Sequence, residues 1–218
     1  MLTLYHAPNS RSSAIVTLID EMGLADWVDI RTVTILRQDG SGAVDPANPH
    51  PEGKVPALLH DGVLITERGA IILHLCALFP DSGLSPKPGT PDWGRFASWL
   101  VWYQGVLEPV LIHRAAGLDH PWLTATFRGP EEATARLHQA LTQGPWLMGD
   151  AWSAADLLVN SPYAWFTDMT PDDPLIQDWL ARCVARPARG RRIMQDAGTQ
   201  DGATQDGATQ DAANQNAA

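Results

Sequence analysis

The sequence contains little cysteine. Its two cysteines among 218 residues, Cys76 and Cys183, lie far apart along the chain. They form no C-x-x-C pair, so neither a dithiol redox site nor a zinc site is indicated. Both lie in apolar helical patterns, and we interpret them as small buried hydrophobic side chains. The histidines, including His74 and His138, show no metal-ligand spacing either, so we expect no metal.

Long apolar runs are also lacking. No stretch approaches the roughly 18 uncharged apolar residues that a membrane span requires. The chain starts with Met1-Leu2-Thr3-Leu4-Tyr5 and becomes polar at once, without the basic and apolar regions of a secretory signal. We therefore predict a cytoplasmic protein with no membrane partner.

Positive charge is scarce. The chain carries 15 Lys and Arg against 25 Asp and Glu, which gives a net charge of −10. This balance argues against nucleic acid as a partner, because phosphates require a basic surface. Residues 197–218 contain no Lys or Arg and repeat a Thr-Gln-Asp-Gly-Ala unit without large apolar side chains. We predict that this tail is disordered, since it cannot bury enough surface to offset its ordering entropy.

Strand and helix signals alternate in the first third of the chain. Residues 2–5 are short and apolar and predict a buried strand. Residues 12–22 have helical spacing and end at Gly23, and residues 28–35 have the character of a second strand. Residues 37–53 hold three glycines and three prolines and predict a loop.

A hairpin and a helix follow this loop. Asp61-Gly62 separates the apolar runs 55–59 and 63–65, which is a strong hairpin signal. Residues 70–79 predict an apolar helix that Pro80 ends. A helix between two strands favours parallel pairing and the hairpin adds antiparallel pairing, so we predict an α/β domain with a mixed four-stranded sheet over residues 1–79.

The remainder of the chain predicts only helices. Residues 80–90 are rich in Pro, Gly and Ser and predict a linker. Beyond them, residues 91–196 are predicted to form an all-α helical bundle. Its expected helices are a long one through residues 96–110 kinked at Pro109, one over 130–143, one that starts at a Ser153–Asp156 capping box, and one over 174–185.

Three segments in this order resemble the glutathione transferase superfamily. They are residues 4–13 (LYHAPNSRSS), residues 48–67 with Gly-Lys-Val-Pro-Ala-Leu, Asp-Gly and Thr-Glu, and residues 147–156 with Ser-Ala-Ala-Asp. The resemblance is to bacterial-type members with serine or asparagine in the first loop. It implies a thioredoxin-like N-terminal domain, an all-helical C-terminal domain and a homodimer.

The resemblance also implies a reaction. Such an enzyme activates the glutathione thiolate for attack on a small apolar electrophile, a detoxification chemistry with glutathione as co-substrate. A free thiol has a pKa of about 8.5, so lowering that pKa increases the nucleophile present at neutral pH. A hydroxyl at a helix N-terminus can donate to the sulfur. Ser10 is the first candidate, followed by Asn9 and Ser12; alternatively, Ser10 or Ser12 caps the helix.

Other candidates would bind the rest of glutathione. The resemblance implies that the Val55–Pro56 bond is cis and that the valine backbone holds the cysteinyl moiety, whereas Pro56 could instead be an ordinary turn proline. Glu67 and Arg68 open a helix where the γ-glutamyl carboxylate would bind. Arg68 departs from the family, which usually has serine there, so it could bind the carboxylate, fill the site or be solvated.

The last candidates lie in a loop and on a long helix. His50 and Lys54 occupy the loop where family members contact the glycine carboxylate, although a solvated loop charge explains them equally well. One helix stripe is formed by Trp102, Val106, Pro109 and His113, and it is either a wall of the electrophile pocket or a dimer contact. Arg68 and the missing tyrosine or cysteine in the first loop leave a second hypothesis, a non-catalytic glutathione transferase-like binding or interaction module.

Overall fold

The computed structural model describes residues 1–197, which form two compact units. The first unit (unit 1) contains residues 1–66 and the described residues from 186 onward, and the second (unit 2) contains residues 67–185. The predicted domain limits were 1–79, 80–90 and 91–196. They differ from the two units, because they place residues 68–78 in the sheet domain and residues 186–196 in the helical domain. The predicted disordered tail lies outside the described residues except for Ala197, which is helical.

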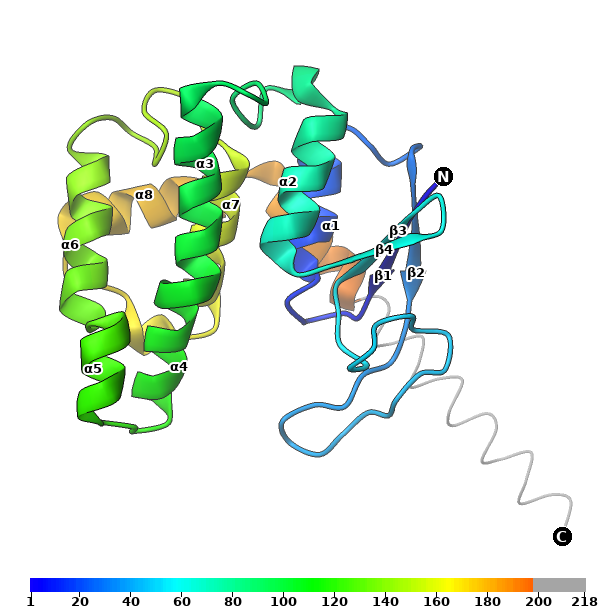
Figure 1. The fold of residues 1–218 in the computed structure, drawn as a ribbon, viewed down its shortest axis with the longest axis horizontal. Coiled ribbons are helices and arrows are strands. Elements are labelled where there is room, and N and C mark those ends of the chain that lie inside the picture. Colours follow the sequence, from blue (N-terminus) through cyan, green and yellow to red (C-terminus); the bar gives the residue numbers. More distant parts are fainter. Residues whose placement is uncertain (198–218) are drawn as a thin grey trace, which may run out of the picture. The chain divides into compact units, whose positions relative to one another are not determined.

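Unit 1 is built on a four-stranded mixed sheet with the strand order β2-β1-β3-β4 (Figure 1). Its strands are β1 (Leu2–His6), β2 (Val28–Thr32), β3 (Ala57–His60) and β4 (Val63–Thr66). Strand β1 pairs parallel with β2 and antiparallel with β3, and β3 pairs antiparallel with β4. The mixed sheet predicted from the sequence is thereby confirmed.

The hairpin between β3 and β4 turns where the Asp-Gly pair predicted it. Asp61 has φ 48° and Gly62 has φ 84°. Two successive left-handed residues match the right-handed twist of the flanking strands, and aspartate and glycine tolerate this conformation. The turn therefore sets the register that pairs Ala57 with Thr66.

Two helices complete unit 1. Helix α1 (Ser13–Glu21) buries Ile15, Leu18 and Ile19, the apolar stripe visible in the sequence. A second helix covers residues 187–197, drawn in orange in Figure 1, and the sequence did not predict it. Arg186 and Arg191, before and within this helix, bind Glu21 and Asp20 of α1.

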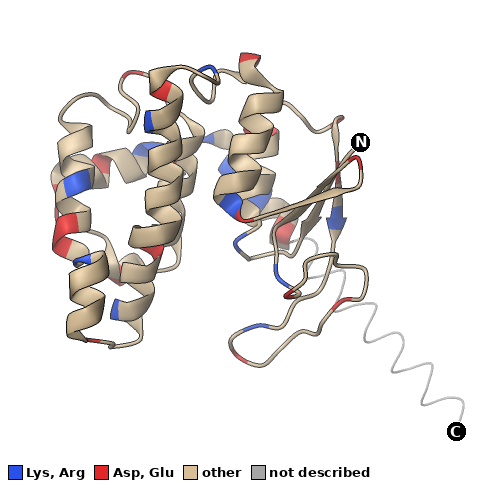
Figure 2. Ribbon diagram, in the orientation of Figure 1, with Lys and Arg blue, Asp and Glu red and all other residues tan. Residues whose placement is uncertain are grey.

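Unit 2 is helical, as predicted for the C-terminal half. It contains α2 (Arg68–Leu78), α3 (Pro91–Trp102), α4 (Glu108–Ala115), α5 (Pro121–Phe127), α6 (Pro130–Leu141), α7 (Ala154–Asn160) and α8 (Pro174–Val184). Short 3-10 turns lie at η1 (Pro80–Ser82), η3 (Ser161–Ala164) and η4 (Thr167–Met169). The first turn of α6 is acidic, with Glu131 and Glu132 favourably placed at the positive end of the helix (Figure 2).

A π-helical segment, η2 (Tyr103–Leu107), joins α3 to α4. The predicted kink at Pro109 is therefore corrected: the irregularity lies before the proline, which occupies the first turn of α4. π-Segments are often found at functional sites.

The start of α7 is fixed by a buried carboxylate. Asp156 accepts hydrogen bonds from the Ser153 N–H at 3.0 Å, the Leu147 N–H at 2.8 Å and the Trp179 indole N–H at 2.9 Å. Burial raises the pKa of Asp156 above its usual value, and these donors act against the shift. The predicted helix start at Ser153 and Asp156 is confirmed. In the part of the chain that the structure describes, no helix is long and apolar enough to cross a membrane.

Candidate functional site

The first loop connects β1 to α1 and contains the predicted sulfur ligands. Ser10 is half-buried, and its hydroxyl lies 2.7 Å from the Ala7 carbonyl oxygen and 2.7 Å from Ser12 Oγ. It also accepts a hydrogen bond from the Ser12 N–H at 3.1 Å. In this structure Ser10 thus orders the loop that immediately precedes the helix.

Ser12 is buried and occupies the N-cap position of α1 without a side-chain capping bond. Its Oγ instead accepts from the Ala7 N–H at 3.2 Å and lies 2.7 Å from Nδ1 of His6. Ser12 is therefore the N-cap residue, as the capping alternative predicted, but its hydroxyl does not cap the helix. The hydroxyl connects Ser10 to the end of β1.

His6 and Asp196 form a buried pair that the sequence did not predict. His6 Nε2 lies 3.2 Å from Asp196 Oδ1, and the two side chains are 7% and 3% exposed. Burial lowers the pKa of His6 below its ordinary value, and the Asp196 carboxylate opposes this shift only in part. His6 is therefore neutral near pH 7.

Asp196 also holds the loop backbone. Its Oδ2 accepts from the Asn9 N–H at 3.1 Å, the Ser13 hydroxyl at 3.0 Å and Arg192 at 3.0 Å. Burial would raise the pKa of this carboxyl, but these donors outweigh burial and hold the pKa below its usual range. Asp196 is accordingly an anion at neutral pH.

Asn9 lies at the tip of the first loop. Its φ of 52° is left-handed, a conformation that asparagine tolerates better than most residues. Arg37 donates to the carbonyl oxygens of Pro8 at 2.8 Å and Asn9 at 3.3 Å. The backbone of Asn9 is thus held from both sides, by Asp196 and by Arg37.

Val55 and Pro56 lie in the same unit as the first loop. The Val55–Pro56 peptide bond is cis, as the resemblance implied. Val55 is buried in one apolar cluster with Tyr5, Ala7 and Ala57 of the sheet and first loop. Its backbone makes no hydrogen bond to another residue within 1–197.

His50 and Lys54 occur in the loop before this proline. His50 is buried, and its Nδ1 accepts from the Glu52 N–H at 3.1 Å. Lys54 is exposed and pairs with the Glu52 carboxylate. His50 is thereby engaged within its own loop, whereas the Lys54 ammonium can exchange its partner in solvent.

Glu67 and Arg68 open helix α2 in unit 2. Glu67 has φ 68°, an uncommon conformation for a residue with a side chain, and its carboxylate accepts from Gln104 at 3.0 Å. The same Gln104 amide accepts from the Gly69 N–H at 2.7 Å. A side chain of the π-helical segment thus satisfies one of the N–H groups at the start of α2.

Arg68 is turned into the helical unit. Its side chain is 6% exposed and donates to Glu108 at 2.7 Å, the Tyr103 hydroxyl at 2.8 Å and the Ser161 hydroxyl at 3.3 Å. The guanidinium also lies 4.9 Å from the centre of the Tyr103 ring. A ligand carboxylate would have to displace Glu108, and the burial of the side chain contradicts the solvated alternative. The structure instead favours a packing role inside unit 2, which the sequence did not predict.

The predicted stripe Trp102, Val106 and His113 is divided among different surroundings. Trp102 is buried, with its ring 5.4 Å from Trp99 and Arg136 4.6 Å from its centre. Val106 is half-buried in the π-helical segment. His113 packs against Phe127 at 5.5 Å.

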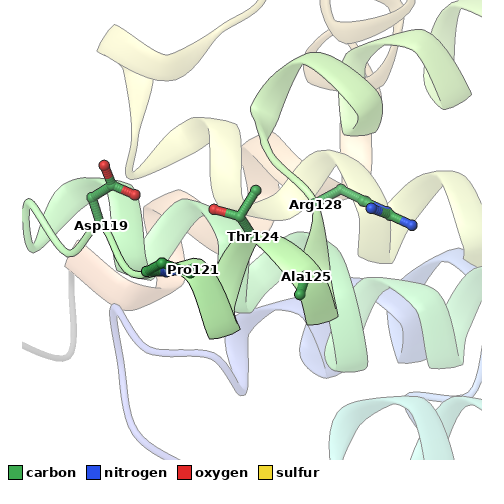
Figure 3. A pocket seen from close by; sticks show the side chains of 5 residues that line it. All are labelled: Asp119, Pro121, Thr124, Ala125 and Arg128. Atoms are coloured by element: carbon green, nitrogen blue, oxygen red, sulfur yellow. The ribbon is translucent and has the colours of Figure 1, made fainter.

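Two surface hollows lie away from most of these residues. One, of about 420 Å³, is lined by Arg37, Gln38 and Asp39, and so borders the arginine that holds the first loop. The other, of about 480 Å³, lies along α5 and is lined by Asp119, Pro121, Thr124, Ala125 and Arg128 (Figure 3). None of the predicted site residues lines either hollow. In residues 1–197, no group of three or more His, Cys, Asp and Glu could hold a metal.

A mixed four-stranded sheet of this topology with a helical unit after it is the glutathione transferase fold. The family model described as the N-terminal domain of glutathione S-transferase matches residues 4–83. A glutathione transferase from Methylococcus capsulatus is 29% identical with a TM-score of 0.72, covering 90% of this chain and 99% of that one. Residues 4–83 thus match the N-terminal domain of the glutathione S-transferases, and the fold of the chain is similar to theirs.

Two further relatives differ in chemistry. A sphingomonad glutathione S-transferase solved in complex with glutathione is 25% identical, with a TM-score of 0.70 over 89% of this chain and 98% of that one. The disulfide-bond oxidoreductase YfcG of Escherichia coli is 26% identical over 89% of this chain and 95% of its own length. The similarity thus concerns the N-terminal domain and the fold, and the particular reaction is a separate question.

The residues missed from the sequence are mainly partners of the predicted ones. His6 stands directly before the first loop, and its position beside the motif was an available signal. Asp196 has no local signal, because it is separated from His6 by 190 positions. Glu108 and Gln104 were missed because they lie at a π-helical segment, which the sequence did not predict.

Proposed function

We propose that this protein is a glutathione-dependent transferase that stabilises the glutathione thiolate at the first loop and directs it at a small apolar electrophile. The observation that carries the proposal is the position of Ser10, a half-buried hydroxyl beside the N-terminus of α1. A hydroxyl and a helix N-terminus both favour a bound anion. Asn9 and Ser12 remain the second candidates for the sulfur contact.

The contacts to the parts of glutathione other than its sulfur are proposed from free backbone groups and from charged side chains. Val55 is proposed to pair with the cysteinyl moiety as an added strand, because its backbone groups make no hydrogen bond to another described residue. Lys54, with His50 in support of its loop, is proposed for the glycine carboxylate. Glu67 is proposed to contribute at the γ-glutamyl end, while Arg68 acts through the packing of unit 2.

The electrophile site is proposed from resemblance. Val106 and His113 are only partly buried and are the stripe residues able to contact an apolar substrate. Trp102 would act through its packing against Arg136 and Trp99. We also retain the homodimer and the cytoplasmic location as part of the proposal.

A second candidate function is a glutathione-binding module without catalysis. The observation that favours it is the short hydrogen bond between Ser10 Oγ and the Ala7 carbonyl oxygen, 2.7 Å, which engages the hydroxyl inside the loop. On this hypothesis the protein would bind glutathione without raising its thiolate fraction.

The test compares Ser10→Ala with Ser98→Ala, an exposed serine on α3 that serves as a matched control. The wild type should bind immobilised glutathione and conjugate it to an activated aryl halide. Ser10→Ala should raise the pKa of the bound thiol by about one unit and lower conjugation at neutral pH about tenfold, with affinity little changed. Binding without conjugation in the wild type would favour the module. Equal activities for the two variants would remove Ser10 from the sulfur contact.

A further inference from the structure

Four side chains of unit 1 form a series of hydrogen-bonding contacts, which begins at a half-buried serine of the first loop and ends at a buried carboxylate. Ser10 Oγ is 2.7 Å from Ser12 Oγ, which is 2.7 Å from His6 Nδ1. His6 Nε2 is 3.2 Å from Asp196 Oδ1. The outer end, Ser10, is half-buried, whereas the other three side chains are buried.

The chemistry of the inner end sets the direction of the hydrogen bonds. A carboxylate only accepts, so the proton of neutral His6 lies on Nε2, toward Asp196. Nδ1 then carries the lone pair and accepts from the Ser12 hydroxyl. The oxygen of Ser12 is left as an acceptor for the Ser10 hydroxyl, whose one proton is shared between Ser12 Oγ and the Ala7 carbonyl oxygen, each 2.7 Å away. In this state both serine hydroxyl protons point toward His6, and His6 Nδ1 is an unprotonated nitrogen that can accept a proton.

We propose that His6 accepts the thiol proton of glutathione through Ser10 and Ser12, with Asp196 holding the imidazole and balancing its charge. This inference rests on the proposed function. The thiol S–H bond breaks and its proton passes to Ser10 Oγ. The Ser10 proton moves to Ser12 Oγ, and the Ser12 proton moves to His6 Nδ1. A thiolate and an imidazolium result, with no other reactant and no net change in protons.

The transfer also reverses the two serines. After it, the imidazolium donates to Ser12, Ser12 donates to Ser10, and the Ser10 hydroxyl points outward to the new thiolate. The Ser10 hydroxyl therefore points inward before the transfer and donates to the thiolate after it. Arg192, bonded to the same carboxylate, is the charged group that opposes protonation of His6.

The experiment counts protons. Glutathione is added to the full-length wild type in lightly buffered solution near pH 7 with an indicator dye. Thiolate is measured by ultraviolet absorbance, and His6 by nitrogen NMR of labelled imidazole. We expect thiolate to form with almost no proton released, together with the NMR shift of a protonated His6. A thiol that loses its proton directly to solvent releases one proton for each thiolate.

Two variants and a control accompany the wild type. Asp196→Asn keeps the shape of the side chain but removes its charge, and His6→Asn removes the base. Each should release the thiol proton to the medium and lower the thiolate fraction at neutral pH about tenfold, a one-unit rise in thiol pKa. His138→Asn removes a different histidine–aspartate pair, His138 with Asp173, and should behave as the wild type.

The outcomes separate this inference from the proposed function. Full proton release by a wild type that forms thiolate, with His6 remaining neutral, would overturn the relay and leave the transferase proposal intact. A wild type that binds no glutathione or forms no thiolate would overturn both. If His6→Asn fails to fold, Asp196→Asn decides, because a purely structural carboxylate would leave the proton count unchanged.

Discussion

Replacing Arg68 by leucine is expected to destabilise the helical unit strongly and to change the affinity for glutathione little. The guanidinium is almost fully buried and donates to Glu108, Tyr103 and Ser161. Removing one partner of a buried ion pair typically costs about 3–5 kcal/mol, because the other charge remains in a poorly solvated place. This is a large part of a total stability of about 5–15 kcal/mol.

The magnitude can be read from urea unfolding. With a denaturant slope of about 2–3 kcal/mol per molar, the loss should move the midpoint down by about 1–2 M. Arg191→Leu is the matched control, since Arg191 forms an exposed pair with Asp20 and should cost less than about 1 kcal/mol. Adding Glu108→Leu to Arg68→Leu should restore much of the stability, because the remaining buried charge is then removed as well.

The contrary result is equally measurable. If Arg68→Leu unfolds at the wild-type urea concentration but binds glutathione much more weakly, the guanidinium serves a ligand carboxylate rather than Glu108. The packing role would then be wrong, and the carboxylate-binding alternative drawn from the sequence would be right.

Three further expectations concern protonation, thiol reactivity and assembly. The lowered pKa of His6 means that the unfolded chain binds a proton more readily than the folded one as pH falls below about 6.5, so stability should decrease from pH 7 to pH 5; thermal unfolding of His6→Asn should show a smaller decrease. Burial raises the pKa of Cys76 to about 11, and Cys183 is also buried, so a thiol reagent at pH 8 should label both only after unfolding. Light scattering at micromolar concentration should give the mass of a homodimer, and a monomeric mass would contradict that part of the proposal.

Most strands and helices could be predicted because their signals are local. The apolar stripe of α1, the Asp61-Gly62 turn and the Ser153 helix start each depend on neighbours within a few residues. Helix α5 was missed because it buries none of its residues and so has no apolar periodicity. The helix over 187–197 was missed for a similar reason, since its buried residues include a small one, Ala188, and a charged one, Asp196.

Only the candidate-site residues that lie within the segments resembling the family could be predicted from the sequence. The serines of the first loop and Val55-Pro56 lie in segments that resemble the family. The direction of Arg68 depends on Glu108 and Tyr103, which lie in or directly after the π-helical segment that interrupts the long helix. A shift of this kind in backbone hydrogen bonding leaves no mark in the pattern of apolar residues.

The contact between Asp196 and Asn9 joins residues 187 positions apart. During synthesis the sheet strands, up to Thr66, emerge long before the residue that fixes the first loop. The ordering of this loop therefore depends on nearly the last described part of the chain, a contact of very high sequence separation that forms late because of its loop-closure cost. A nascent chain would carry the strands of unit 1 before it could carry an ordered first loop, which requires residue 196.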